Sequence, residues 1–120
     1  MEIDIDLDVR LPKAEAGSLK SLPAKYTVQI EESENAIQAR IGYAHGKSLA
    51  VAKDISQLVK EFLDGLKGFK ATGGEGTLRL GIYYDTNDQV TVSIGLSRPC
   101  LQELTAAGYE LDMTAYPCSD

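Results

Sequence analysis

Ser48–Gly68, SLAVAKDISQLVKEFLDGLKG, is the segment against which the other parts of the chain must pack. Its apolar residues recur at intervals of three and four, which is typical of one stripe of an α-helix. These residues are Val51, Ile55, Leu58, Val59, Phe62 and Leu66. Ser48 or Asp54 can cap the first turn, and Gly65 and Gly68 stand where a left-handed residue would end the helix. Because the other side is charged and polar, the helix needs an apolar sheet to cover.

Six further segments alternate apolar and polar residues, and a period of two predicts half-buried β-strands. They span residues 2–11, 26–30, 36–44, 77–84, 89–96 and 109–116. A second, shorter helix is predicted from Ser97, a good N-cap, to Gly108, with Pro99 in its first turn. The predicted order of elements is therefore βββαββαβ.

Two pairs of these strands are joined by short polar turns, which predicts β-hairpins. One hairpin joins 26–30 to 36–44, and the clearer one joins 77–84 to 89–96. Alternation throughout indicates a mainly antiparallel sheet with one apolar and one polar face. The predicted fold is an α+β two-layer sandwich, with about six strands and both helices on one face.

The composition is that of a single globular domain spanning residues 1–120. The net charge of −6, from 12 Lys and Arg against 18 Asp and Glu, disfavours nucleic acid and suits a basic protein partner. No apolar run has the length of a membrane span, and the first nine residues, MEIDIDLDV, lack the features of a secretion signal. We therefore expect a cytoplasmic protein that binds neither nucleic acid nor membrane, and the sequence leaves its oligomeric state open.

The two cysteines, Cys100 and Cys118, are separated by a predicted helix, a tight turn and a strand. A helix advances much less per residue than a strand, so the two thiols should end far apart. We expect both to be free, since a disulfide would require the C-terminal residues to fold back.

One acidic motif superficially resembles a calcium-binding loop. Asp4, Asp6 and Asp8 alternate along the first predicted strand, and Glu15 stands at the twelfth position of such a loop. A calcium loop needs glycine at its sixth position, where this chain has Val9. The three carboxylates are therefore predicted to line the solvent face of a strand, either at a sheet edge, beside arginines, or facing a cationic partner.

No other motif carries catalytic or cofactor chemistry. The glycine-rich segment 73–76 lacks the lysine and hydroxyl residue of a phosphate-binding loop, and it precedes a strand instead of following one. The single histidine, His45, has no flanking signature of a hydrolase. We therefore predict a protein that is not an enzyme and that holds no cofactor or metal.

The polar face of the predicted sheet is the remaining candidate for function. Its arginines and tyrosines are typical anchors of protein interfaces, and its carboxylates would attract a basic partner. The predicted partner-binding residues are Asp4, Asp6, Asp8, Arg40, Arg79, Tyr83, Asp112 and Tyr116. The acidic turn with Glu31, Glu32 and Glu34 is an alternative contact.

The segment 92–117, VSIGLSRPCLQELTAAGYELDMTAYP, resembles the closing segment of a bacterial family of domains of unknown function, number 4279. There a strand leads into a short helix, and a final alternating strand ends in tyrosine. The matching residues are Leu96, Ser97, Leu101, Leu104, Gly108, Leu111, Asp112 and Tyr116. The resemblance implies a small bacterial α+β protein, and similar small acidic proteins serve as immunity partners of toxins. It transfers no functional residue, because the family offers no catalytic motif.

We therefore expect a non-enzymatic protein-binding domain, most concretely an immunity or inhibitor protein that blocks the active site of a basic toxin domain. The alternative is a small-molecule-binding domain or weak enzyme with a pocket between helix and sheet. Tyr26, Tyr43 and Tyr84 could line that pocket. An enzyme should show a cleft with converging titratable groups, whereas a binding protein should not.

Overall fold

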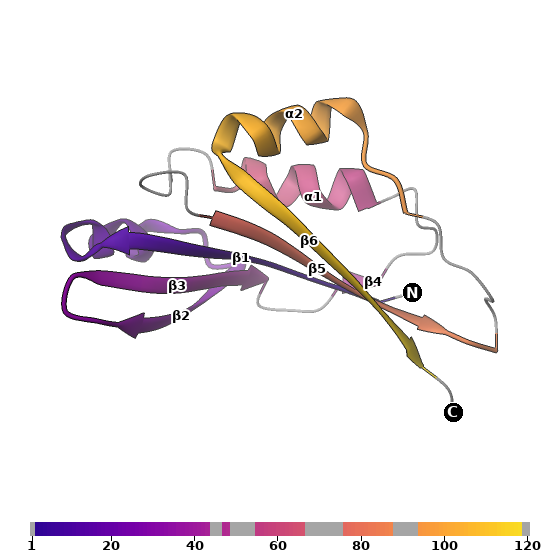
Figure 1. Ribbon diagram of the computed structural model, residues 1–120, viewed down its shortest axis with the longest axis horizontal. Coiled ribbons are helices and arrows are strands. Elements are labelled where there is room, and N and C mark those ends of the chain that lie inside the picture. Colours follow the sequence, from indigo (N-terminus) through magenta and orange to yellow (C-terminus); the bar gives the residue numbers. More distant parts are fainter. Residues whose placement is uncertain (1, 44–46, 49–54, 67–75, 88–93, 119–120) are drawn as a thin grey trace.

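The computed structural model describes residues 2–43, 47–48, 55–66, 76–87 and 94–118 of the chain (Figure 1). The described elements are β1 (Glu2–Pro12), the 3₁₀-helix η1 (Lys13–Ser21), β2 (Tyr26–Glu32), β3 (Ala36–Tyr43), β4 (Lys47–Ser48), α1 (Ile55–Asp64), β5 (Gly76–Asp85), α2 (Arg98–Ala107) and β6 (Tyr109–Cys118). The protein is an α+β protein built on one open sheet. None of the described helices is long and apolar enough to cross a membrane.

The sheet is mixed, not simply antiparallel. Its strands lie in the order β2-β3-β1-β5-β6, and the two-residue β4 pairs with the start of β1. β1 pairs antiparallel with β3 and β5, and β2 pairs antiparallel with β3. β6 runs parallel to β5, because α2 carries the chain back to the start of β5 before β6 begins. The strand with the acidic residues, β1, is therefore central.

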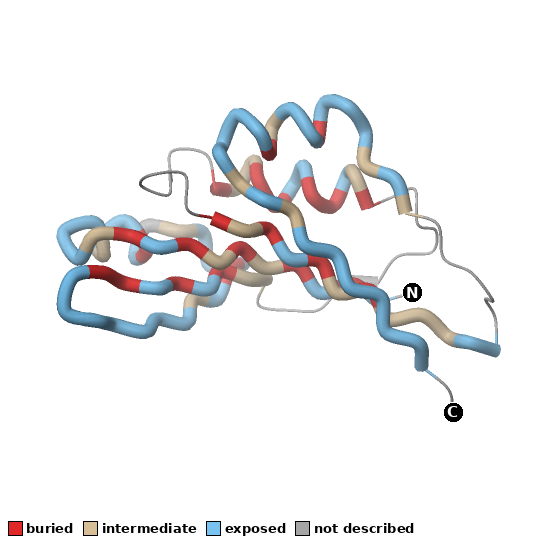
Figure 2. Tube along the Cα trace, in the orientation of Figure 1, coloured by how far each residue is buried: buried red, intermediate tan, exposed pale blue. Residues whose placement is uncertain are grey.

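Both α1 and α2 lie over the same face of the sheet (Figure 1). That face is apolar, as the alternation predicts, and buried residues concentrate along the strands that the helices cover (Figure 2). Every second residue of β1 is buried in one core cluster: Ile3, Ile5, Leu7, Val9 and Leu11. Burying an aliphatic side chain of this size contributes about 1.5–3 kcal/mol. Leu19 of η1 and Leu104 of α2 join the same cluster.

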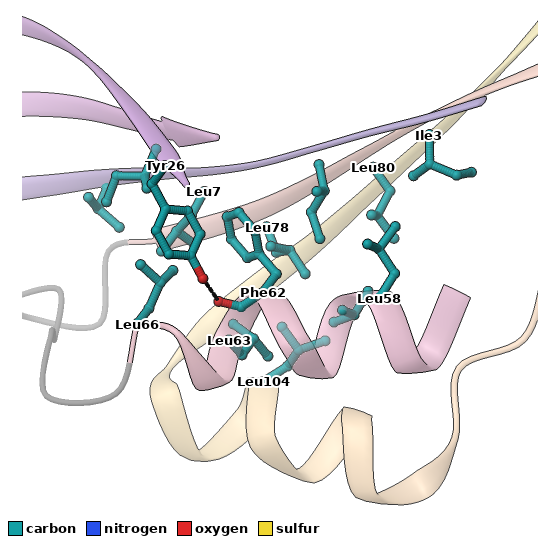
Figure 3. Close-up of a cluster of buried hydrophobic side chains, with 14 of the residues drawn as sticks. Ile3, Leu7, Tyr26, Leu58, Phe62, Leu63, Leu66, Leu78, Leu80 and Leu104 are labelled. Carbon is teal, nitrogen blue, oxygen red and sulfur yellow. Dashed lines mark hydrogen bonds between the residues drawn. The ribbon is translucent and has the colours of Figure 1, made fainter. Parts of the chain in front are cut away.

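The apolar stripe of the predicted central helix faces this core. Its described members are all buried: Ile55, Leu58, Val59, Phe62 and Leu66 (Figure 3). Ser48, one of the two predicted caps, belongs to β4 and pairs with Glu2. The alternative cap Asp54, the apolar Val51 and Gly68 lie outside the described residues.

The end of α1 is fixed by a tyrosine from β2. The hydroxyl of Tyr26 donates a 2.6 Å hydrogen bond to the carbonyl of Phe62, in the last turn of α1 (Figure 3). The amide of Leu66 donates to Leu63 and not to Phe62, so this hydroxyl takes the place of the missing backbone donor. Gly65 lies against it: a Cβ at Gly65 would lie 2.0 Å from the Tyr26 hydroxyl oxygen. Gly65 is thus needed for close approach, and not for the positive φ that was expected of it.

α2 confirms the caps predicted from its sequence. The side chain of Ser97 accepts a hydrogen bond from the amide of Cys100, and Pro99 lies in the first turn. Gly108 ends the helix with a φ of 79°, in the left-handed region that favours glycine. Cys100 and Leu104 of this helix are buried, while Leu101 is 45% exposed. Both Cys100 and Cys118 are free, which confirms that they do not pair.

The predicted hairpin of 77–84 with 89–96 is wrong. β5 pairs with β1 on one side and with β6 on the other, so neither of its edges is left for residues 89–96. Residues 94–97 are irregular, and 88–93 lie outside the described residues. The expected order βββαββαβ is therefore not the observed one.

Candidate functional site

The face of the sheet opposite the helices carries the polar residues, and we call it the open face. It displays alternate residues of β1, β3, β5 and β6 in cross-strand rows. The central row places Asp6 of β1 opposite Arg79 of β5, and Arg79 opposite Asp112 of β6. The register thus places the guanidinium of Arg79 between two carboxylates from separate strands. Opposite charges in neighbouring strands attract one another, which favours this row.

A second row lies beside it, toward β3. Asp8 stands opposite Arg40, and the side-chain amide of Gln38 donates a hydrogen bond to Asp8. The charges of Arg40 and Arg79 both act on Asp6, and Asp8 stands opposite Arg40, whereas Asp4 stands opposite Gly81. The expectation that the three aspartates mark a sheet edge is wrong, because β1 is the central strand. The interpretation that they lie beside arginines holds for Asp6 and Asp8.

Asp6 is partly buried on the open face. Its Oδ1 atom is shielded from solvent and accepts no hydrogen bond. Burial raises the pKa of Asp6 above the ordinary 3.8, and the neighbouring Asp8 and Asp4 act in the same direction. Arg40 and Arg79 oppose this shift without cancelling it. Asp6 therefore carries a negative charge that the fold itself only partly compensates.

A small hollow of about 110 Å³ opens beside this row. It forms because Gly81 of β5 has no side chain between Asp4 of β1 and Thr114 of β6. One end is closed by Tyr83 and Tyr116, whose rings stack at 5.0 Å. A Cβ at Gly81 would lie 3.5 Å or more from its nearest atoms, which is ordinary van der Waals contact. Gly81 therefore leaves space in the hollow and is not required by a close approach of its neighbours.

Three carboxylates line this hollow, and that of Asp4 bonds to Tyr83 at its tyrosine end. A hydrogen bond with Asp4 raises the pKa of Tyr83, because the phenol proton is held by the carboxylate. The other end is formed by Arg79 and Asp112. The hollow therefore offers aromatic faces at one end and charged groups around the rest of its rim.

The structure gathers the predicted partner-binding residues on one face. Six of them line the hollow: Asp4, Asp6, Arg79, Tyr83, Asp112 and Tyr116. Asp8 and Arg40 line a second depression over β2 and β3, together with Glu31 of the alternative acidic turn. Glu32 and Glu34 are exposed where β2 turns into β3, next to the end of β1 that lies farthest from Asp4.

Gln38 and Thr114 lie on this face, as the alternation predicts, and Gly81 is the member that the prediction omits. The signal for Gly81 was present in the sequence, because alternation through 77–84 places it between Arg79 and Tyr83 on the polar side. Its meaning depends on the register with β1 and β6, which the sequence does not display.

Two of the tyrosines proposed to line a pocket between helix and sheet, Tyr26 and Tyr43, fill that space instead, and the third, Tyr84, lies near the end of β5 in register with Pro117. Tyr26 and Tyr43 stack at 5.4 Å, and both rings meet the ring of Phe62 edge-on, at 5.3 and 5.1 Å. The Tyr26 hydroxyl is occupied by the Phe62 carbonyl, and burial raises the pKa of Tyr26 to about 12. Tyr26 and Tyr43 are thus part of the core on the helix side.

Within the described part of the chain, no group of three His, Cys, Asp or Glu side chains is placed to hold a metal ion. No protein-family model, curated protein or solved structure matches this chain.

Proposed function

We propose that this protein is a binding protein that recognises a basic protein partner through the open face of its sheet. The observation that carries the proposal is the convergence of Asp4, Asp6 and Asp112 with the Tyr83–Tyr116 stack around one hollow. The helices lie on the opposite face, so a flat protein surface can approach the open face without displacing any described element.

A cationic side chain is the group that this hollow suits best. A lysine or arginine of the partner would meet carboxylates on the rim and aromatic faces at its end, and both kinds of contact favour a cation. Arg79 and the tyrosines are residue types that often dominate interface energetics. The partly compensated charge of Asp6 would gain from the same cation, because burial and the neighbouring carboxylates already raise the pKa of Asp6 above its ordinary value.

The most concrete form of this proposal is an immunity protein that covers the active site of a basic toxin domain. The net charge of −6 and the resemblance of segment 92–117 to the bacterial family described above support it. Long-range attraction between an acidic inhibitor and a basic toxin would speed their association.

The experiment uses two triple variants with the same loss of charge. Asp4→Asn, Asp6→Asn and Asp8→Asn together remove three negative charges from the open face, whereas Glu31→Gln, Glu32→Gln and Glu34→Gln remove three from the acidic turn. Tagged wild type and both variants are used to co-purify proteins from the native host. The association rate of each is then measured with the purified partner at low and high salt.

We expect the open-face variant to associate about tenfold more slowly or worse and to lose most of its salt dependence, because exposed charges are screened beyond about 10 Å at 0.1 M salt. The acidic-turn variant should be slowed less, because only Glu31 of its three residues lies beside Asp8 and Arg40. The reverse pattern would assign the contact to the turn, and an unchanged rate in both would refute steering of the partner by either acidic group.

A further variant tests the hollow without changing charge. Gly81→Val places two methyl groups between Asp4 and Thr114, where the rim has room for a Cβ. We expect the protein to remain folded and the dissociation rate of the partner to rise, because the inserted cation loses its space. An unchanged dissociation rate would show that the hollow is not part of the interface. The role of the charged rows is tested separately, by the triple variants.

A further inference from the structure

β6 is a long edge strand. Among the described residues, β5 is its neighbour on one side and no strand pairs with it on the other. Most of its ten residues are exposed, including Met113 and Tyr116 at 44% each. An edge of this length presents a row of unpaired amides and carbonyls to any strand that can match it.

The orientation of that row follows from one hydrogen bond. The amide of Thr86 donates to the carbonyl of Cys118 at 2.9 Å, and Cys118 is in register with Asp85. In a strand, the backbone groups of successive residues point alternately to the two neighbouring positions in the sheet. Even-numbered residues of β6 therefore bond to β5, and Leu111, Met113 and Ala115 turn their amides and carbonyls outward. Pro117 also falls on the outward side. Because it has no amide proton, this position means that no hydrogen bond to β5 is missing.

We infer that β6 pairs antiparallel with β6 of a second copy of this chain, across a twofold axis at Met113. In this register Met113 faces Met113 of the second copy, and Leu111 faces Ala115 in both directions. All three pairs are of the hydrogen-bonded kind, which gives about six backbone hydrogen bonds. The two sheets then join into one continuous sheet.

Side-chain charge selects this register among those that the backbone allows. With the axis at Met113, the carboxylate of Asp112 faces the hydroxyl of Thr114, and Glu110 faces the hydroxyl of Tyr116. A slip of two residues in one direction places Asp112 opposite Asp112, and like charges directly opposite are destabilising. A slip in the other direction sets Leu111 against Pro117, which cannot donate. With the axis at Met113, only Tyr109 at the end of β6 stands opposite Pro117, so this register avoids like charges and keeps its three central pairs intact.

The helix side of β6 gives the second copy an apolar surface. Met113 is in register with Leu80 and Ala115 with Ile82, so both point to the face that carries the core. Leu80 and Ile82 are buried, but Met113 and Ala115 are exposed. A second copy would cover these side chains and extend the core across the axis.

Sedimentation over a concentration series tests the inference directly. The wild type should rise from the 13.0 kDa of one chain to twice that mass. Met113→Lys and Met113→Glu should each remain monomeric, because like charges meet at the axis, and an equal mixture of the two should dimerise. Leu101→Lys is the matched control: it adds the same charge at a residue with 45% exposure on α2, and it should leave the dimer intact.

Hydrogen exchange on the wild type tests the same contact without a substitution. Amides of Asp112, Thr114 and Tyr116 should be protected at every concentration, whereas those of Leu111, Met113 and Ala115 should become protected only as the dimer forms. A wild type that stays at 13.0 kDa throughout, a Met113→Lys variant that still dimerises, or outward amides that never gain protection would overturn the inference. The outcome is separate from the proposed function, since a monomer could still bind a basic partner through the open face.

Discussion

Replacing Gly65 by alanine should destabilise this protein, although the same change usually stabilises a helix. Gly65 has no positive φ, so alanine would ordinarily gain about 0.4–1 kcal/mol by restricting the unfolded chain. Here the added Cβ would lie 2.0 Å from the hydroxyl oxygen and 2.9 Å from Cζ of Tyr26. The ring must move, and the movement breaks the hydrogen bond to the Phe62 carbonyl.

The size of the effect follows from the groups that lose their contacts. A buried carbonyl left without a donor costs about 1–3 kcal/mol, and displacing a packed ring costs a similar amount. Tyr26 is 7% exposed, and its ring packs against those of Tyr43 and Phe62. The ring therefore cannot move out into solvent without losing these contacts. We expect Gly65→Ala to lower the free energy of unfolding by about 2–4 kcal/mol. Tyr26→Phe should lower it by about 1–3 kcal/mol.

The double variant separates the clash from other effects. Tyr26→Phe removes the atom at 2.0 Å and leaves the contact at 2.9 Å, so Gly65→Ala should cost less in that background than in the wild type. The coupling energy should be about 1 kcal/mol or more. Urea unfolding followed by circular dichroism measures all four proteins, since the chain has no tryptophan to report by fluorescence. A stabilising Gly65→Ala, or additive effects in the double variant, would refute the reasoning.

Three further predictions concern the core, the open face and the thiols. Phe62 is a fully buried residue of α1, so Phe62→Ala should lower the free energy of unfolding by about 3–5 kcal/mol in the same assay. A loss below about 1 kcal/mol would contradict its burial. The pKa of Asp6 is raised above 3.8, so its ionisation opposes folding. Asp6→Asn should therefore raise the free energy of unfolding at neutral pH, by less than about 1 kcal/mol. This gain should vanish below pH 3.8, where the carboxyl is protonated in both the folded and the unfolded protein. Urea unfolding at both pH values checks the sign, and a variant less stable than wild type at neutral pH would reverse it. Thiol titration of the unfolded, non-reduced protein should count both cysteines, and a count of zero would show a disulfide.

The parts of the fold that the sequence predicts well are those set by local contacts. Alternation over 2–11 fixes which side chains of β1 face the core, and β1 is observed over Glu2–Pro12. Ser97 and Gly108 cap α2 through bonds within one turn of the chain. Such contacts depend only on neighbours in sequence, so the residue types reveal them.

Strand partners depend on distant parts of the chain, and there the prediction fails. Residues 77–84 and 89–96 both alternate and are joined by a polar turn, yet β5 pairs with β1 and β6 instead. The N-terminal strand occupies one edge of β5, and α2 delivers β6 to the other edge. Alternation also overestimates burial at the edges: Ile30 of β2 lies on the core face but is 49% exposed.

The candidate site shows the same division. The polar identity of the open face follows from alternation alone, which is why all the predicted contact residues lie on one side of the sheet. The rows, the hollow at Gly81 and the central position of β1 follow from register, which sequence periodicity does not specify. The role of Gly65 was misjudged for a related reason, because the ring that it contacts comes from β2.

The position of Asp6 joins the energetics of the fold to the proposed function. A carboxylate oxygen shielded from water without a hydrogen bond lowers stability, and an apolar or amide side chain could replace it at a central strand position. Proteins retain such local costs mainly where a ligand or partner relieves them. If a partner's cation offsets the charge of Asp6, Asp6→Asn should make the free protein more stable and the complex weaker. Opposite signs for these two effects would link the charge to binding, whereas a gain in stability with unchanged binding would leave Asp6 as a cost that the proposed interface does not explain.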